Sequence, residues 1–137
     1  MKCKNKKNSK ILAQHYISTN SPSSSEWKRI LCNGHDSGLE INRKGVVRFQ
    51  DSHNIYPHRC IERYRAIDFS VGKDRFTICI HRIVACIFIP IPTKYSSRGY
   101  NQLSLFPVHI NNDTLNNSTS NITWMTSEEL TKKLNVK

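Results

Sequence analysis

The sequence has few acidic residues, and this shortage is its most informative feature. Its 137 residues include 10 Asp and Glu against 21 Lys and Arg, which gives a formal net charge of +11. Such an excess favours a polyanionic partner, because each neutralised phosphate releases counterions and adds sequence-independent affinity. Solubility, or a ribosome-like structural role, is the plainer explanation. We expect a nucleic acid to be the partner.

The sequence also lacks paired cysteines and long apolar runs. Its five cysteines are scattered and include no C-x-x-C pair. Neither a zinc knuckle nor a disulfide framework is therefore expected, and a reducing cytoplasm is the default. The longest apolar stretch, residues 78–91, is interrupted by His81 and Arg82 and is too short to span a bilayer. With no signal peptide visible, we expect a cytoplasmic protein without membrane contact.

The first half of the chain changes character at residue 26. Lysines near the start and serines from residue 18 onward predict that residues 1–25 form a basic flexible arm and a linker. Beyond them, the stretches 39–42 and 46–49 alternate in polarity around a turn at residues 43–45. These stretches predict a β-hairpin with a basic tip.

A core helix is expected in the middle of the chain. Residues 67–69 and 75–80 have the composition of two strands joined by a turn. Residues 81–89 then place their apolar side chains on one stripe and stop before Pro90, which predicts a buried helix.

The end of the chain predicts strand, loop, strand and helix within thirty residues. A short apolar run ends at His109, an Asn-rich loop follows, and a second strand-like piece surrounds Trp124. Residues 126–129 (Thr-Ser-Glu-Glu) then match a capping box, which opens a helix. This unit is too small to fold alone and has the size of a catalytic finger docked on a larger module.

Three ordered motifs in this sequence resemble the HNH endonuclease family, in its phage and intron-homing branch. His109-Ile110 with the Asn-rich loop matches the first motif. Residues 121–126 (Asn-Ile-Thr-Trp-Met-Thr) match the second, twelve residues after His109. Residues 81–90 (His-Arg-Ile-Val-Ala-Cys-Ile-Phe-Ile-Pro) match the helix that precedes them. Glu26-Trp27-Lys28, with residues 39–48, is similar to a small nuclease-associated module.

The resemblance covers residues 26–134 and implies an α+β fold. A small antiparallel β-sheet with hairpins and a core helix would form the nuclease-associated module over residues 26–90. A C-terminal ββα finger (a His-Me finger) would follow over residues 91–137. In such a finger, His109 is the general base that activates water for attack on a phosphodiester, and Asn121 orients its imidazole.

The two metal-ligand positions of the family carry apolar residues here. Val108 precedes the base, and Leu130 lies nine residues after Asn121. Mg²⁺ needs oxygen ligands, which neither side chain supplies. We therefore expect no metal ligand and no certain cofactor. Mg²⁺ would bind only if other acidic side chains substituted, and the candidates are Asp113, Glu128 and Glu129.

Basic side chains interleaved with aromatic ones suggest where nucleic acid would lie. They fall at the hairpin tip, in the aromatic-rich stretch that follows it, at the start of the core helix and in the loop after Pro90. Solvated surfaces or ordinary packing would explain the same residues. The expected contacts are Arg43, Lys44, Arg48, Arg63, Arg65, Arg82, Lys94 and Arg98.

The resemblance implies a DNA-binding protein of the HNH endonuclease family that is phage-encoded, acts in the host cytoplasm, and nicks or cleaves DNA with His109 as general base. Without a cation, such a base supplies only about 10²–10⁴-fold acceleration. Cutting would then need substitute acidic ligands, an Arg or Lys in place of the cation's charge, or a labile substrate such as an abasic site. The alternative is a catalytically degenerate HNH protein that binds DNA, or a host DNA-repair or DNA-processing enzyme, as an inhibitor or regulator. The spacing of His109 and Asn121 favours cutting, whereas Val108 and Leu130 favour binding alone.

Overall fold

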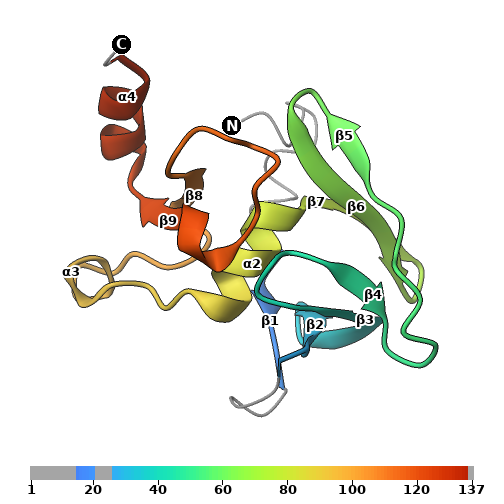
Figure 1. Ribbon diagram of the computed structural model, residues 1–137. Helices are drawn as coiled ribbons and strands as arrows, with labels where there is room; N and C mark the ends of the chain where they lie inside the picture. The colour runs from blue at the N-terminus through green and yellow to red at the C-terminus, as the bar shows by residue number, and fades with distance from the viewer. Residues whose placement is uncertain (1–14, 21–25, 136–137) are drawn as a thin grey trace.

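Helix α2 (Ile80–Phe88) lies at the centre of the molecule, with strands packed around it (Figure 1). The computed structural model describes residues 15–20 and 26–135. The helix buries Ile83, Val84 and Ala85 completely, because its apolar stripe faces the strands. The helix ends at Phe88, because Pro90 disfavours a helical backbone at the preceding residue, Ile89. The predicted core helix is confirmed, with each end shifted by one residue.

A four-stranded antiparallel sheet forms the first layer, in the order β1 (Ile17–Ser18), β2 (Lys28–Cys32), β3 (His35–Ile41) and β4 (Val47–Phe49). The predicted hairpin is confirmed, since Ile41 lies opposite Val47 and Leu39 opposite Phe49.

Strand β1 differs from the expectation that residues 1–25 form an arm and a linker. Ile17 is fully buried and pairs with Cys32 of β2. The side-chain amide of Gln102 also accepts the N–H of Ile17 and donates to its carbonyl, both at 2.8 Å. The remaining parts of that prediction, residues 1–14 and 21–25, lie outside the described residues.

A second antiparallel sheet contains β5 (Arg59–Ile61), β6 (Tyr64–Val71) and β7 (Asp74–Cys79). The turn between β5 and β6 is tight, and Glu62 adopts a positive φ of 59° there. A left-handed backbone is unfavourable for a side chain of this kind. The two residues after this turn, Arg63 and Tyr64, lie next to the loop that follows His109, where the Arg63 carbonyl accepts the Thr114 hydroxyl.

The third unit consists of β8 (Phe106–His109), the 3₁₀ helix η1 (Thr119–Asn121), β9 (Ile122–Met125) and α4 (Ser127–Asn135). Strands β8 and β9 are antiparallel, and the short helix α3 (Thr93–Ser96) precedes them.

The predicted capping box opens α4. Thr126 Oγ1 accepts the N–H of Glu129 at 3.2 Å, and Glu129 Oε1 accepts the N–H of Thr126 at 3.0 Å. Beyond this cap the helix buries no residue. Leu134 is 59% exposed. Leu130 is half-buried.

One hydrophobic core joins these units. Ile122 and Trp124 of β9 belong to the same cluster as Ile83 and Val84 of α2, and the indole N–H of Trp124 donates to the carbonyl of Ile89 at 2.8 Å. The predicted nuclease-associated module (residues 26–90) and finger (residues 91–137) therefore share one hydrophobic core. Within the described ranges, no helix has the length and apolarity needed to cross a bilayer.

Candidate functional site

His109 closes strand β8 and is only 4% exposed. Two further rings surround its imidazole. The ring of His81, in the first turn of α2, lies 4.5 Å away between centroids, and the ring of Tyr64 lies 5.9 Å away and nearly parallel. Tyr64 also stacks on His81 at 5.3 Å. A strand, a helix and a hairpin thus each contribute one ring to a small stack.

Asn117 fixes the orientation of the His109 imidazole. Its Oδ1 atom lies 2.8 Å from His109 Nε2, and both side chains are buried. Because an amide oxygen only accepts, this pairing places the imidazole proton on Nε2 and leaves the lone pair on Nδ1. The imidazole is therefore held in the tautomer that can take a proton through Nδ1.

Gly45 allows Asn117 to reach this position. The glycine lies in the β3–β4 turn with φ +85°, and a Cβ there would fall 2.9 Å from the Asn117 Cβ. The Arg43 carbonyl accepts the N–H of Thr119 at 2.9 Å, two residues beyond Asn117. The basic hairpin is thus part of the scaffold around His109.

Burial keeps both histidines of the stack neutral. Desolvation is the largest effect on His109 and lowers its pKa, although the Asn117 hydrogen bond and the charge of Asp113 oppose this shift. Burial likewise lowers the pKa of His81 to about 3, with further contributions from His109 and Arg82. Neutral His109 can accept a proton at pH 7, as a general base must.

The Asn121 side chain forms its hydrogen bonds with the loop backbone, not with the His109 imidazole that it was expected to orient. Its Oδ1 accepts the N–H of Asn111 at 3.1 Å, and its Nδ2 donates to the carbonyls of Asn116 (3.0 Å) and Asp113 (3.4 Å). The side chain of Asn121 therefore closes the Asn-rich loop on itself. Its effect on His109 is indirect, because that loop carries Asn117.

Three basic residues surround the same loop. Besides Arg43, the Arg63 carbonyl accepts the Thr114 hydroxyl at 2.5 Å, and the Lys133 ammonium donates to Asn112 Oδ1 at 2.7 Å. Lys133 was not among the predicted contacts. In the sequence, Lys132 and Lys133 are adjacent and equivalent. Only the structure distinguishes Lys133, because its side chain reaches Asn112 in the loop.

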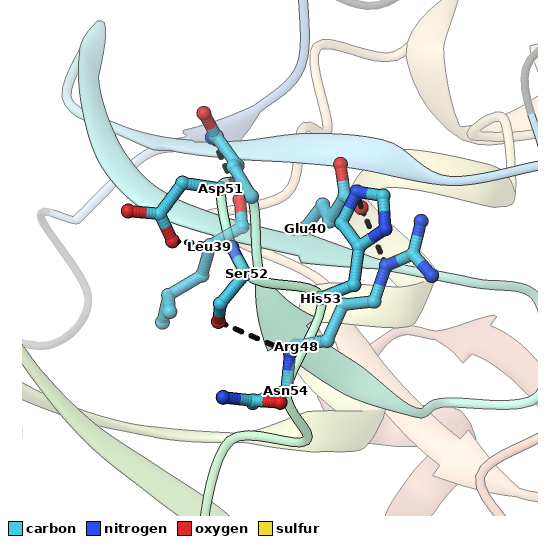
Figure 2. A network of polar contacts seen from close by, with 8 residues as sticks. Leu39, Glu40, Arg48, Asp51, Ser52, His53 and Asn54 are labelled. Atoms are coloured by element: carbon cyan, nitrogen blue, oxygen red, sulfur yellow. Dashed lines mark hydrogen bonds and ion pairs between the residues drawn. The ribbon is translucent and has the colours of Figure 1, made fainter.

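Arg48, a predicted nucleic-acid contact, is already engaged within the protein. Its Nε lies 2.5 Å from Glu40 Oε2, and its guanidinium covers the Trp27 ring at 3.6 Å. Figure 2 shows the side chains of Arg48 and His53 close to the Glu40 carboxylate, and His53 Nε2 is 3.9 Å from the same carboxylate oxygen. The charge of Arg48 is therefore largely neutralised.

Arg82 is also engaged within the protein. Its guanidinium donates to the carbonyls of Gln102 and His15, at 3.3 and 3.4 Å, which ties α2 to the segment leading into β1. Arg65 is half-buried on β6. The other predicted contacts are exposed, namely Arg43, Lys44, Arg63, Lys94 and Arg98. Of these, Lys94 and Arg98 lie over the rings of Tyr95 and Tyr100, around α3 rather than beside the Asn-rich loop.

The residues around His109 do not fit a divalent cation. Val108 is buried and Leu130 is half-buried, and neither carries an oxygen atom. Among the acidic candidates, Glu129 accepts the Tyr95 hydroxyl at 2.6 Å in addition to its capping role, and Asp113 Oδ1 accepts the N–H of Leu115. Over residues 15–20 and 26–135, no three His, Cys, Asp or Glu side chains are grouped to hold a metal ion.

Comparisons with known proteins match the fold but supply no sequence family. No family model and no curated protein sequence matches this chain. Among solved structures, the HNH homing endonuclease I-HmuI, described as binding and cleaving DNA, is similar over 80% of this chain, with a TM-score of 0.62 and 24% sequence identity. The similar region spans 57% of the I-HmuI chain. The protein thus has a small α+β fold like that of an HNH endonuclease.

Proposed function

We propose that this protein binds DNA and cuts one of its strands, with His109 as the general base of a C-terminal ββα finger formed by β8, β9 and α4. The observation that carries the proposal is the buried contact of His109 with Asn117, in a chain whose fold is similar to that of an HNH endonuclease. The resemblance of the motifs to the phage branch of that family favours a phage-encoded protein.

The charge distribution supports DNA as the partner. The exposed side chains of Arg43, Lys44 and Arg63 come from two hairpins that both contact the Asn-rich loop. Exposed basic groups on separate elements provide the sequence-independent attraction that a phosphate backbone needs. A formal charge of +11 adds a long-range component to the same attraction.

The tautomer of His109 supports the chemistry. Nδ1 can take a proton from water while the water oxygen attacks phosphorus, and the bond from phosphorus to the leaving oxygen then breaks. Asn117 maintains the imidazole orientation through this step, because its Oδ1 accepts a hydrogen bond from the Nε2–H group. In the family, a divalent cation would stabilise the negative charge that develops on the phosphate, but Val108 and Leu130 do not provide ligands for one.

General-base catalysis alone accelerates a reaction by about 10²–10⁴-fold, which is far below what an intact phosphodiester needs. An abasic or otherwise labile site lowers this requirement. At an abasic sugar, a base only needs to remove a proton next to the aldehyde, and the 3′ phosphate then leaves. We therefore propose labile sites as the preferred substrates.

A second candidate function is DNA binding without cutting, or binding to a host DNA-processing enzyme as an inhibitor. The 4% exposure of His109 favours it, because a DNA strand can approach a buried imidazole only if the structure around it moves. The apolar Val108 and Leu130 favour it as well. The basic surface would then serve affinity alone.

Plasmid nicking separates the two functions. Purified protein is incubated with supercoiled plasmid, intact or carrying abasic sites, in Mg²⁺ or in a chelator, and DNA binding is measured in parallel. Cutting of abasic plasmid with slower or no cutting of intact plasmid supports the first function. Equal binding with no cutting under any condition supports the second, and absence of binding contradicts both.

A further inference from the structure

We infer that the ammonium group of Lys133 binds the scissile phosphate and supplies the positive charge that a divalent cation would otherwise supply, so that cutting does not require a metal ion. This inference rests on the proposed function. It starts from the mismatch between the fold, which implies a cation beside the base, and Val108 and Leu130, which cannot bind one.

Lys133 is held next to the turn that follows His109. Its Nζ donates to Asn112 Oδ1 at 2.7 Å, and the backbone N–H of Asn112 points to the His109 carbonyl at 3.4 Å. Asn112 has a positive φ of 67°, a conformation that Asn tolerates better than most residues. The ammonium group is therefore attached to the segment that carries the base, although it comes from the last helix.

The natural helical partner of Lys133 is occupied elsewhere. Glu129 lies four residues earlier on α4, the spacing at which Glu and Lys pair along a helix. Its Oε1 instead accepts the Tyr95 hydroxyl and the N–H of Thr126. Across residues 15–20 and 26–135, the ion pairs involve Arg48, His53 and Arg59 and not Lys133. The charge of Lys133 is therefore available to an anion.

The position of Lys133 on α4 suits the replacement. Leu130, at the family's ligand position, lies three residues earlier on the same face of the helix. An ammonium has three donors, and Asn112 accepts one of them. The other two can reach phosphate oxygens, and a lysine binds phosphate as a compact charge on a flexible stem. Lys133 would thus stabilise the charge that develops while Nδ1 of His109 takes the proton.

The plainer role of Lys133 is to stabilise the C-terminal end of α4 through the helix dipole. Lys132 provides the matched control, because it lies on the same last turn, is exposed, and carries the same charge. A dipole effect would be shared by both lysines. An effect on cutting should belong to Lys133 alone.

The test measures single-turnover nicking of an abasic duplex in chelator for the wild type, Lys133→Gln and Lys132→Gln, together with DNA affinity. We expect Lys133→Gln to slow nicking by about 100-fold or more, the usual effect of removing one preorganised donor. Its affinity should fall by less than about tenfold, as for one phosphate contact. Lys132→Gln should nick at the wild-type rate. Equal rates for the wild type and Lys133→Gln overturn the inference, as does wild-type nicking that chelator abolishes.

A second arm restores oxygen ligands in the Lys133→Gln background by adding Val108→Asp and Leu130→Asn. We expect Mg²⁺ to raise nicking by this triple variant and to leave the wild type unchanged. Its melting temperature shows whether it folds. Failure of this inference is distinguishable from failure of the proposed function. Nicking that needs His109 but not Lys133 contradicts only the role of Lys133, whereas a wild type that cuts no substrate contradicts both.

Discussion

The Nε2 atom of His109 lies 2.8 Å from Oδ1 of Asn117. Asn117 in turn packs so closely against Gly45 that a Cβ at position 45 would fall 2.9 Å from the Asn117 Cβ. The orientation of one imidazole therefore depends on a strand end, a loop and a hairpin turn that are far apart in the sequence. Each of these segments can be changed separately, and each change has a distinct expected result.

Replacing Asn117 tests the orientation of the base. In Asn117→Ala the buried imidazole N–H loses its acceptor, which costs about 1–3 kcal/mol, and nicking should slow by about tenfold or more, at 1.4 kcal/mol per tenfold in rate. Asn117→Asp keeps an acceptor and should retain nicking. The ¹⁵N chemical shifts of the His109 ring report the tautomer directly. Nicking by Asn117→Ala at the wild-type rate would remove Asn117 from the account.

Replacing Gly45 tests the hairpin contact. Gly45→Ala and Gly34→Ala both place a methyl group at positive φ, near +85° and +83°, and each should lower the free energy of unfolding by about 1–2 kcal/mol. Only Gly45→Ala pushes against Asn117, because nothing lies within 4 Å of a Cβ at Gly34. We expect nicking to fall in Gly45→Ala alone. Denaturant unfolding and nicking rates measure the two effects, and equal losses of nicking would contradict this role.

Stability should fall in mild acid because of His81. Its pKa is about 3 when folded and 6.5 in a model peptide, so between these values the unfolded chain binds the extra proton. Stability is then complete above pH 6.5 and is lost as pH falls, by about 1.4 kcal/mol per pH unit from this group. Urea unfolding at pH 7 and pH 5 should differ by more for the wild type than for His81→Phe. The same pH dependence in both proteins would contradict the assignment.

Lys44 and Arg48 should affect DNA binding differently although both lie on one hairpin. Lys44 is exposed, and Lys44→Gln should lower the slope of log affinity against log salt by about 0.9. Arg48 pairs with Glu40 and covers Trp27. Arg48→Gln should therefore cost about 1–3 kcal/mol of stability by leaving a carboxylate unpaired, with little change in the salt slope. A larger slope change in Arg48→Gln would reverse these roles.

The elements with strong local patterns could be predicted from the sequence. The apolar stripe of α2 ends shortly before Pro90, the β3–β4 stretches alternate in polarity around a glycine turn, and the capping box of α4 is visible in four residues. In each case the pattern and the fold agree because the signal lies within the element itself. Strand β1 has only two residues, which is too short to show the alternation of polar and apolar residues that predicts a strand.

The candidate site was predicted less completely, because its contacts are formed by loop closure. The sequence pointed to His109, but several Asn residues in the loop are equivalent in pattern, and only the closed loop shows that Asn117 contacts the ring while Asn121 binds the loop backbone. Arg48 and Arg82 looked like exposed cations, although their partners lie on neighbouring elements. A basic residue in a sequence does not reveal whether the fold already gives it a partner within the protein.

The measurement that tests the central claim most directly is nicking by His109→Ala, with DNA affinity measured on the same preparation. His109 is buried and neutral at pH 7, so we expect affinity within about twofold of the wild type, while nicking falls by about 10²–10⁴-fold, the usual contribution of a general base. His58→Ala, which removes an exposed histidine, should behave as the wild type. Nicking by His109→Ala at the wild-type rate would contradict the account.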